Sequence, residues 1–108
     1  MNTWDKKYND KGEVAVLYSP GYGAGWYTWS TGEEQALFDS RIVDLVLADK
    51  QDQIHEEFMK SIGLKGSYTG GAGQLQVEWI KKGTLFKIDE YDGSESIEYK
   101  EDEGWAVA

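Results

Sequence analysis

The chain of 108 residues contains no cysteine and only one proline, one histidine and one arginine. Without cysteine there is no disulfide framework, no thiol catalysis and no Cys-ligated zinc or iron–sulfur site, which suits a reducing cytoplasm. A zinc site is equally unsupported, because His55 has no second histidine to join it and no H-E-x-x-H motif is present. A Ser-His-Asp triad would depend on the same histidine, and no serine lies in a G-x-S-x-G motif. We therefore expect no catalytic residues, no metal and no cofactor.

Long hydrophobic segments are also missing. The longest apolar runs, residues 14–18 and 42–48, are far shorter than the roughly 20 residues that cross a bilayer. Residues 1–12 are polar, whereas a secretory signal needs an apolar segment there. A chain of this length fits one domain. We expect a cytoplasmic protein with no membrane contact, forming a single domain over residues 1–108 with residues 1–12 as a possible loose arm.

Negative charge is in excess and is concentrated in one place. The net charge is −9, which disfavours direct binding to nucleic acid because phosphate contacts need Lys and Arg. Residues 89–103 hold eight carboxylates against Lys100 alone. Such a patch either keeps the protein in solution or attracts a basic partner. Its spacing does not match an EF-hand loop, so a metal is not expected. The residues that would face a partner are Asp89, Asp92, Glu95, Glu98 and Glu101.

Local patterns predict the first half of the fold. The apolar run over residues 13–18, closed by Pro20 and Gly21, is typical of a largely buried strand. Thr31 and Glu34 form a capping box, which predicts a short helix from about residue 32. A second helix, capped at residue 39 or 40, carries the apolar face of residues 42–47, and a third spans residues 52–62 and ends at Gly63.

After the third helix the hydrophobic period changes to two. Alternation predicts strands over residues 74–79 and 84–91, separated by a turn at residues 81–83. Asp92-Gly93 is a hairpin signal that leads into a strand over residues 95–100, and a last strand covers residues 105–108. These elements predict a single α+β domain: one N-terminal strand, two or three helices, then a C-terminal antiparallel β-meander with the helices on one face.

The segment SPGYGAGWYTWSTG, residues 19–32, is uncharged and rich in glycine and aromatic residues. Its glycines allow the main chain to approach a ligand, successive N–H groups can form an anion-binding nest, and aromatic rings can stack on a base. The spacing is neither that of a P-loop nor that of the dinucleotide fingerprint. The alternative is an irregular strand-to-helix crossing whose aromatic side chains fill the core or a protein interface.

A second glycine-rich loop, residues 65–73, would form a two-sided cleft if it lay beside the first, and is otherwise a mobile surface turn. Arg41 can clamp an anion or pair with Asp39 or Asp44. The candidate ligand-binding residues are Gly21, Tyr22, Gly23, Gly25, Trp26, Tyr27, Trp29, Arg41, Tyr68, Gly70 and Gly71.

Three segments and one residue near the end of the chain resemble a family of small phage and prophage proteins of unassigned activity. They are VAVLYSPGYGAGWYTW (residues 14–29), LFDSRIVDLVL (37–47), GGAGQLQVEWIKKGTLFKIDEYDGSE (70–95) and Trp105. The resemblance spans most of the chain. It implies the setting of an anti-defence factor in the host cytoplasm, which either sequesters a nucleotide immune signal or blocks a defence protein.

Three hypotheses follow. In the first, the glycine and aromatic loop sequesters a nucleotide-like immune signal, in a site completed across a homo-oligomer interface because exposed aromatic loops would otherwise leave a large apolar patch. In the second, the acidic face covers a nucleic-acid-binding surface of a basic host defence protein, with strong salt dependence. In the third, the chain is an accessory phage protein without a ligand.

Overall fold

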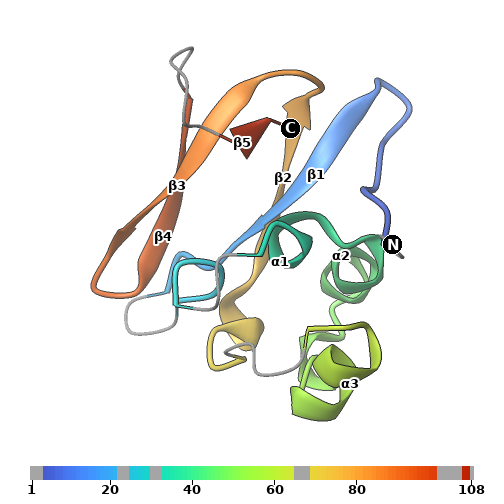
Figure 1. The fold of residues 1–108 in the computed structure, drawn as a ribbon, viewed down its shortest axis with the longest axis vertical. Coiled ribbons are helices and arrows are strands. Elements are labelled where there is room, and N and C mark those ends of the chain that lie inside the picture. Colours follow the sequence, from blue (N-terminus) through green and yellow to red (C-terminus); the bar gives the residue numbers. More distant parts are fainter. Residues whose placement is uncertain (1–3, 22–24, 30–32, 65–68, 100–105, 108) are drawn as a thin grey trace.

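The computed structural model describes residues 4–21, 25–29, 33–64, 69–99 and 106–107 (Figure 1). Strand β1 (Glu13–Tyr18) precedes helices α1 (Gln35–Phe38), α2 (Ser40–Leu47) and α3 (Glu56–Ser61), followed by strands β2 (Gln76–Lys81), β3 (Leu85–Tyr91), β4 (Ser94–Tyr99) and β5 (Ala106–Val107). Short 3-10 turns cover Gln51–Gln53 and Ala72–Gln74. The predicted single-domain α+β fold, with an N-terminal strand, few helices and antiparallel strand pairs, is confirmed.

The described strands form two small antiparallel sheets. β1 pairs with β2, from Glu13 opposite Lys81 to Tyr18 opposite Gln76, and the second sheet has the order β4-β3-β5. In this second sheet, β3 and β4 are consecutive in the chain and form a hairpin. β5 pairs with the other edge of β3. The start of β4 lies next to the residue that follows β1, because the Glu95 N–H donates to the Ser19 carbonyl at 2.7 Å.

β1 is buried on both faces, as its continuous apolar run predicts. Because side chains alternate along a strand, Ala15 and Leu17 face a cluster built with the helices, while Val14 and Val16 face a second cluster that includes Phe86 of β3. Figure 1 accordingly shows the helices next to β1 and β2, and the β3–β4 hairpin across the other side of β1. No helix within the described ranges has the length and hydropathy that crossing a bilayer requires.

The described part of the N-terminal segment, residues 4–12, is held against the domain. Tyr8 forms a β-bridge with Val14, and the Ala15 N–H donates to the Lys7 carbonyl at 2.9 Å. The Trp4 ring stacks on the core ring of Phe38, with centroids 6.3 Å apart. The expectation of a loose arm is wrong here because the segment satisfies the free edge of β1.

The helix boundaries follow the predicted caps in part. Asp39 caps α2 by accepting a hydrogen bond from the Arg41 N–H at 2.9 Å, as predicted. α3 begins later than expected, after His55, whose Nδ1 accepts the Phe58 N–H at 3.3 Å. It ends before Gly63, which has a φ of +92° and so suits glycine. Of the predicted capping box only Glu34 is described, and its side chain caps nothing in α1.

The turn between β3 and β4 is of the kind that Asp-Gly predicts. Asp92 and Gly93 have φ values of 55° and 84°, both left-handed, as a two-residue type I′ turn requires. This turn sets the register of the hairpin, which places Glu90 opposite Glu95 and Tyr91 opposite Ser94. The register determines which carboxylates of the acidic segment point inward.

Candidate functional site

The two glycine-rich loops lie side by side. The Ser19 hydroxyl donates to the Gly71 carbonyl at 3.3 Å, and the Gly21 backbone lies so close to Gln74 that an added Cβ would be 2.7 Å from its Cγ. Of the second-loop candidates, Gly71 is buried and Gly70 exposed, while Tyr68 lies outside the described residues. The condition for a two-sided cleft, that the loops lie side by side, is met at these residues, but here the loops are in direct contact and no cleft separates them.

Glu95 occupies the anion-binding position of the first loop. Its side chain is 1% exposed, and one carboxylate oxygen accepts the Ser19 N–H at 3.0 Å. The other oxygen accepts the N–H groups of Trp26 at 3.1 Å and Thr28 at 2.8 Å, together with the Thr28 hydroxyl at 2.7 Å. These N–H donors, on Ser19, Trp26 and Thr28, are neither successive nor glycines, unlike those of the expected nest, and the anion that they bind belongs to the protein itself.

The expectation that Glu95 faces a partner is consequently wrong. Phe86 and Ile88 of β3 pack inward, so Glu90 lies on the same face of the strand, and its cross-strand neighbour Glu95 shares that face. The Ser94 hydroxyl also donates to the Pro20 carbonyl at 2.7 Å, which fastens the start of β4 to the loop. The signal was present in the sequence, because a two-residue Asp-Gly turn fixes this register.

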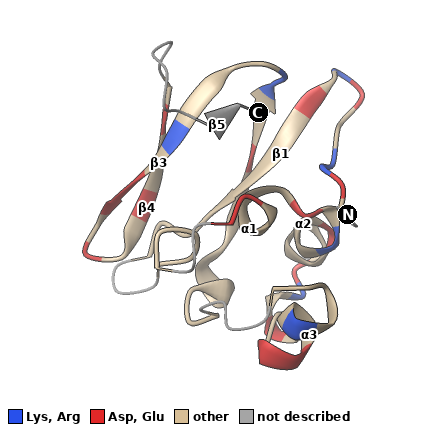
Figure 2. Cartoon of the chain, viewed as in Figure 1, with Lys and Arg blue, Asp and Glu red and all other residues tan. Residues whose placement is uncertain are grey.

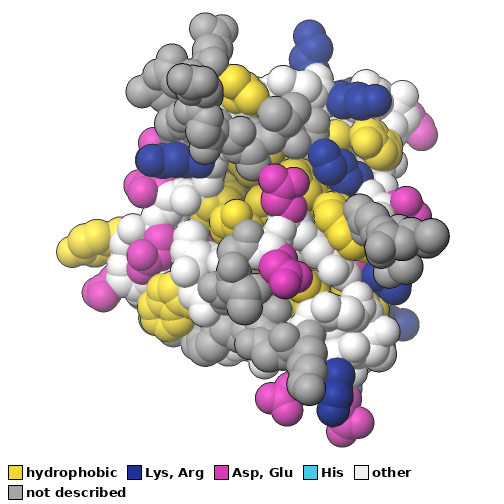
Figure 3. Space-filling model, in the orientation of Figure 1, with side chains coloured by type: hydrophobic (Ala, Val, Ile, Leu, Met, Phe, Trp, Pro, Cys, Tyr) yellow, Lys and Arg dark blue, Asp and Glu magenta, His cyan; other side chains and the backbone are white. Residues whose placement is uncertain are grey.

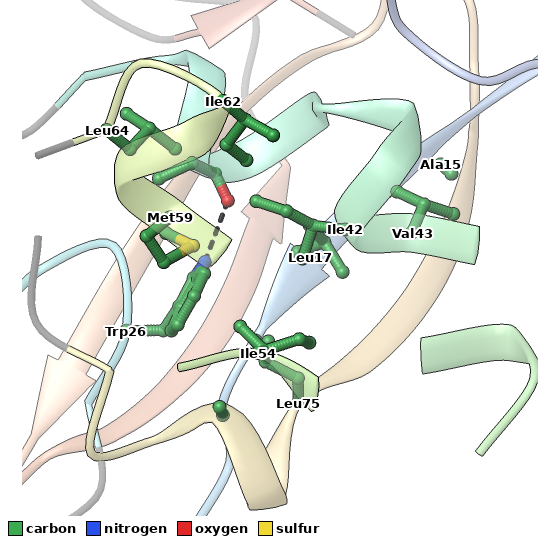
Figure 4. Packing of buried hydrophobic residues seen from close by; sticks show 12 residues of the cluster. Ala15, Leu17, Trp26, Ile42, Val43, Ile54, Met59, Ile62, Leu64 and Leu75 are labelled. Atoms are coloured by element: carbon green, nitrogen blue, oxygen red, sulfur yellow. Dashed lines mark hydrogen bonds between the residues drawn. The ribbon is translucent and has the colours of Figure 1, made fainter. Parts of the chain in front are cut away.

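Trp26 belongs to the hydrophobic core and cannot stack on a ligand in this structure. Its side chain is 1% exposed, and its indole N–H donates to the Ala36 carbonyl at 2.7 Å (Figure 4). Figure 4 shows the ring close to Met59 of α3 within the same cluster. Burying the large apolar ring while satisfying its one donor is favourable, which explains why this aromatic faces inward. The proposed stacking role of Trp26 is therefore withdrawn.

The remaining aromatic residues of the loop are distributed differently. Tyr27 is partly buried against both core clusters, and burial, followed by the nearby charge of Glu34, raises its pKa. Trp29 is 41% exposed, and its indole N–H donates to Glu90 at 3.3 Å. Gly25 packs on the Trp29 ring so closely that an added Cβ would lie 2.6 Å from the indole Cγ. Tyr22 and Gly23 lie outside the described residues.

Arg41 pairs with Asp39 and not with a ligand. Its Nε donates to one oxygen of the buried Asp39 carboxylate at 3.0 Å, and a terminal nitrogen donates to the other at 2.8 Å. The same carboxylate accepts from the Gln35 side chain at 2.8 Å. The hydrogen bond with Asp39 raises the pKa of Arg41. Among the sequence alternatives, the intramolecular pair is the one that forms.

Exposed carboxylates remain on the β3–β4 hairpin. We define the hairpin surface as Asp89, Asp92, Glu98 and Tyr91, all of them exposed and Tyr91 by 74%. In the pairing register Asp89 and Tyr91 lie on the strand face opposite the core-facing Phe86 and Ile88. Figure 2 shows acidic positions along the hairpin, and Figure 3 shows acidic and hydrophobic side chains together at its closed end. Glu101 lies outside the described residues.

One further carboxylate contact lies between the sheets. The Tyr99 hydroxyl of β4 donates to Glu78 of β2. Burial and this hydrogen bond raise the pKa of Tyr99 to about 12. The contact links the two sheets at the end of the hairpin opposite the Asp92-Gly93 turn. It attaches the hairpin to β2 at the end away from Glu95.

Comparison with known proteins adds no assignment, since no family model, no curated protein and no solved structure matches this chain. Nor do three or more acidic or histidine side chains gather as a metal-binding group within the part of the chain that the structure describes.

Proposed function

We propose that this protein is a binding module without catalytic activity that presents the hairpin surface to a basic protein partner. The observation that carries the proposal is the exposure of Asp89, Asp92, Glu98 and Tyr91 on a hairpin that is fixed to the domain. Exposed carboxylates of one sign steer a positively charged partner, and tyrosine is enriched at protein interfaces.

Anchoring of the hairpin supports this role. Glu95 binds the loop at the closed end, and Tyr99 binds Glu78 at the other. A surface held in place before binding loses less conformational entropy when a partner docks. Lys87 lies opposite Glu98 and reduces the negative charge there, whereas residues 88–97 contain no Lys or Arg, so the negative charge of the hairpin is concentrated near the Asp92 turn.

The partner class follows from the charge. Grooves that bind nucleic acid carry Lys and Arg for phosphate contacts, and a carboxylate surface can occupy the same groove. Within the phage setting that the sequence resemblance implies, we propose an inhibitor that covers such a groove on a host defence protein.

The nucleotide-sequestering hypothesis has less support. It requires free backbone donors and stacking rings in the first loop, whereas Ser19, Trp26 and Thr28 donate their N–H groups to Glu95. The core position of Trp26 also removes one reason for expecting an oligomer, since that ring is not an exposed apolar group. Self-association stays a prediction, which sedimentation velocity tests. The accessory role without a ligand also stays a prediction, which partner binding tests.

The experiment uses a fluorescent arginine-rich peptide as the probe and measures its binding by anisotropy over a salt series. The hairpin variant combines Asp89→Asn, Asp92→Asn and Glu98→Gln. Each exposed charge contributes about 0.2–1 kcal/mol, so the three together should weaken binding by roughly tenfold. Asp92→Asn preserves the turn, because Asn-Gly also favours type I′ geometry.

A matched control neutralises three exposed carboxylates elsewhere, with Asp10→Asn, Asp49→Asn and Asp52→Asn. Both triple variants change the net charge by the same amount, so a general charge effect weakens binding equally in the two. The proposal predicts that the control binds like the natural protein and that only the hairpin variant loses affinity. Equal loss in the two variants would contradict it.

A further inference from the structure

The contact between Glu95 and the first loop has the form of a receptor holding a ligand. The donors are separated from Glu95 by 76 residues at Ser19, 69 at Trp26 and 67 at Thr28, so no local turn explains their convergence. Both carboxylate oxygens are engaged, and the side chain is buried. A buried carboxylate persists only where its hydrogen-bonding capacity is satisfied, and here the loop supplies it.

Among the described residues, the groups that donate to the carboxylate all belong to the first loop. Three of the four donors are backbone N–H groups and the fourth is the Thr28 hydroxyl. Oriented backbone N–H groups bind carboxylate and phosphate oxygens irrespective of which chain carries them. The hairpin contributes the anion at the start of β4, where the Glu95 N–H and the Ser94 hydroxyl also donate to loop carbonyls.

We infer that the first loop is an oxyanion receptor whose resident ligand is the Glu95 side chain, and that it accepts a small free carboxylate when that side chain is shortened. The receptor consists of Ser19, Trp26 and Thr28. In the natural protein an external oxyanion reaches these donors only by displacing Glu95, which would detach the start of β4 from the loop. The attached carboxylate has the advantage of a high effective concentration, so the receptor is autoinhibited. This inference does not depend on the proposed partner.

The test removes the resident ligand and supplies it in solution. Glu95→Ala deletes Cγ and the carboxylate, which are the atoms that acetate replaces. Melting is measured by circular dichroism at neutral pH in sodium acetate and in sodium chloride of equal ionic strength. We expect Glu95→Ala to melt below the natural protein and to gain several degrees in a saturable manner with acetate, because a ligand that binds only the folded state raises its melting temperature.

Glu98→Ala is the matched control, since it deletes an exposed glutamate from the same strand. The natural protein and this control should melt identically in the two salts, which separates binding from a general effect of acetate. If Glu95→Ala folds and acetate stabilises it no more than chloride does, the inference is overturned.

If Glu95→Ala does not fold in either salt, amide hydrogen exchange tests whether the loop N–H groups bind the Glu95 carboxylate. In the natural protein the backbone N–H groups of Trp26 and Thr28 should exchange slowly with solvent. In the isosteric Glu95→Gln variant they should exchange at least about tenfold faster, because a neutral amide is a weaker hydrogen-bond acceptor than a carboxylate. Equal exchange of these amides in the two proteins overturns the inference. The peptide-binding assay is a separate measurement, so failure here and failure of the proposed function can be told apart.

Discussion

Replacing Gly25 by alanine should destabilise the protein by about 1–2 kcal/mol. The added Cβ would lie 2.6–2.8 Å from three atoms of the Trp29 indole, closer than carbon atoms approach in proteins. Moving the ring away would strain its 3.3 Å hydrogen bond to Glu90. Overpacking of this kind costs about 1–3 kcal/mol, while the reduced freedom of the unfolded chain returns about 0.4–1 kcal/mol.

For a chain of this size the loss corresponds to a fall in melting temperature of about 4–8 °C, since 1 kcal/mol shifts the midpoint by roughly 4 °C. Urea unfolding followed by circular dichroism gives the free energy of unfolding directly. Gly73→Ala is the matched control, because no atom lies within 4 Å of its added Cβ. It should leave stability unchanged or raise it slightly.

A double variant identifies the cause. Combining Gly25→Ala with Trp29→Ala removes the ring that the methyl group would meet, so alanine at position 25 should cost nothing in the Trp29→Ala background. If Gly25→Ala alone is as stable as the natural protein, the close packing of loop and indole is refuted. An undiminished penalty in the double variant would refute the assignment of the clash to Trp29.

Two further predictions concern Trp26 and Tyr99. Trp26→Phe should lower the free energy of unfolding by about 1–3 kcal/mol, because the Ala36 carbonyl loses its indole donor. Urea unfolding measures this free energy. An unchanged value would show that the hydrogen bond contributes nothing to stability. The raised pKa of Tyr99 means that the folded state favours the neutral phenol. Its contribution to stability should therefore be complete below pH 10 and lost as the pH rises toward about 12, whereas Tyr99→Phe should not show this loss. Phenolate absorbance during pH titration reports the ionisation, and identical alkaline profiles for the two proteins would argue against the Glu78 contact.

Local patterns in the sequence were sufficient for the elements of the fold. The apolar run of β1, the cap at Asp39 and the Asp92-Gly93 turn each depend on neighbouring residues alone, and each occurs as expected. The order of the strands was harder to predict, because the pairing of β5 with β3 depends on contacts between segments that are distant in the sequence. Nothing in the composition of residues 105–108 distinguishes that partner from β4.

The candidate site was predicted less well than the fold. A cluster of acidic residues suggests a uniformly exposed surface, yet Glu95 points inward because its strand position matches that of the core-facing Ile97. That position could be deduced from the hairpin register. The identity of its donors could not, since the loop reaches Glu95 only through long-range folding. The burial of Trp26 could not be predicted either, because an irregular loop has no periodicity that separates buried from exposed rings.

The most direct test of the proposed function is to map where a basic partner binds. Backbone amide signals of the ¹⁵N-labelled protein are followed by NMR during titration with the arginine-rich peptide. If the hairpin surface is the binding site, the largest shifts fall on residues 89–98 and diminish as salt is added. Shifts of equal size over α3 and the N-terminal segment, or shifts confined to helices, would contradict the claim that the hairpin surface is the binding site.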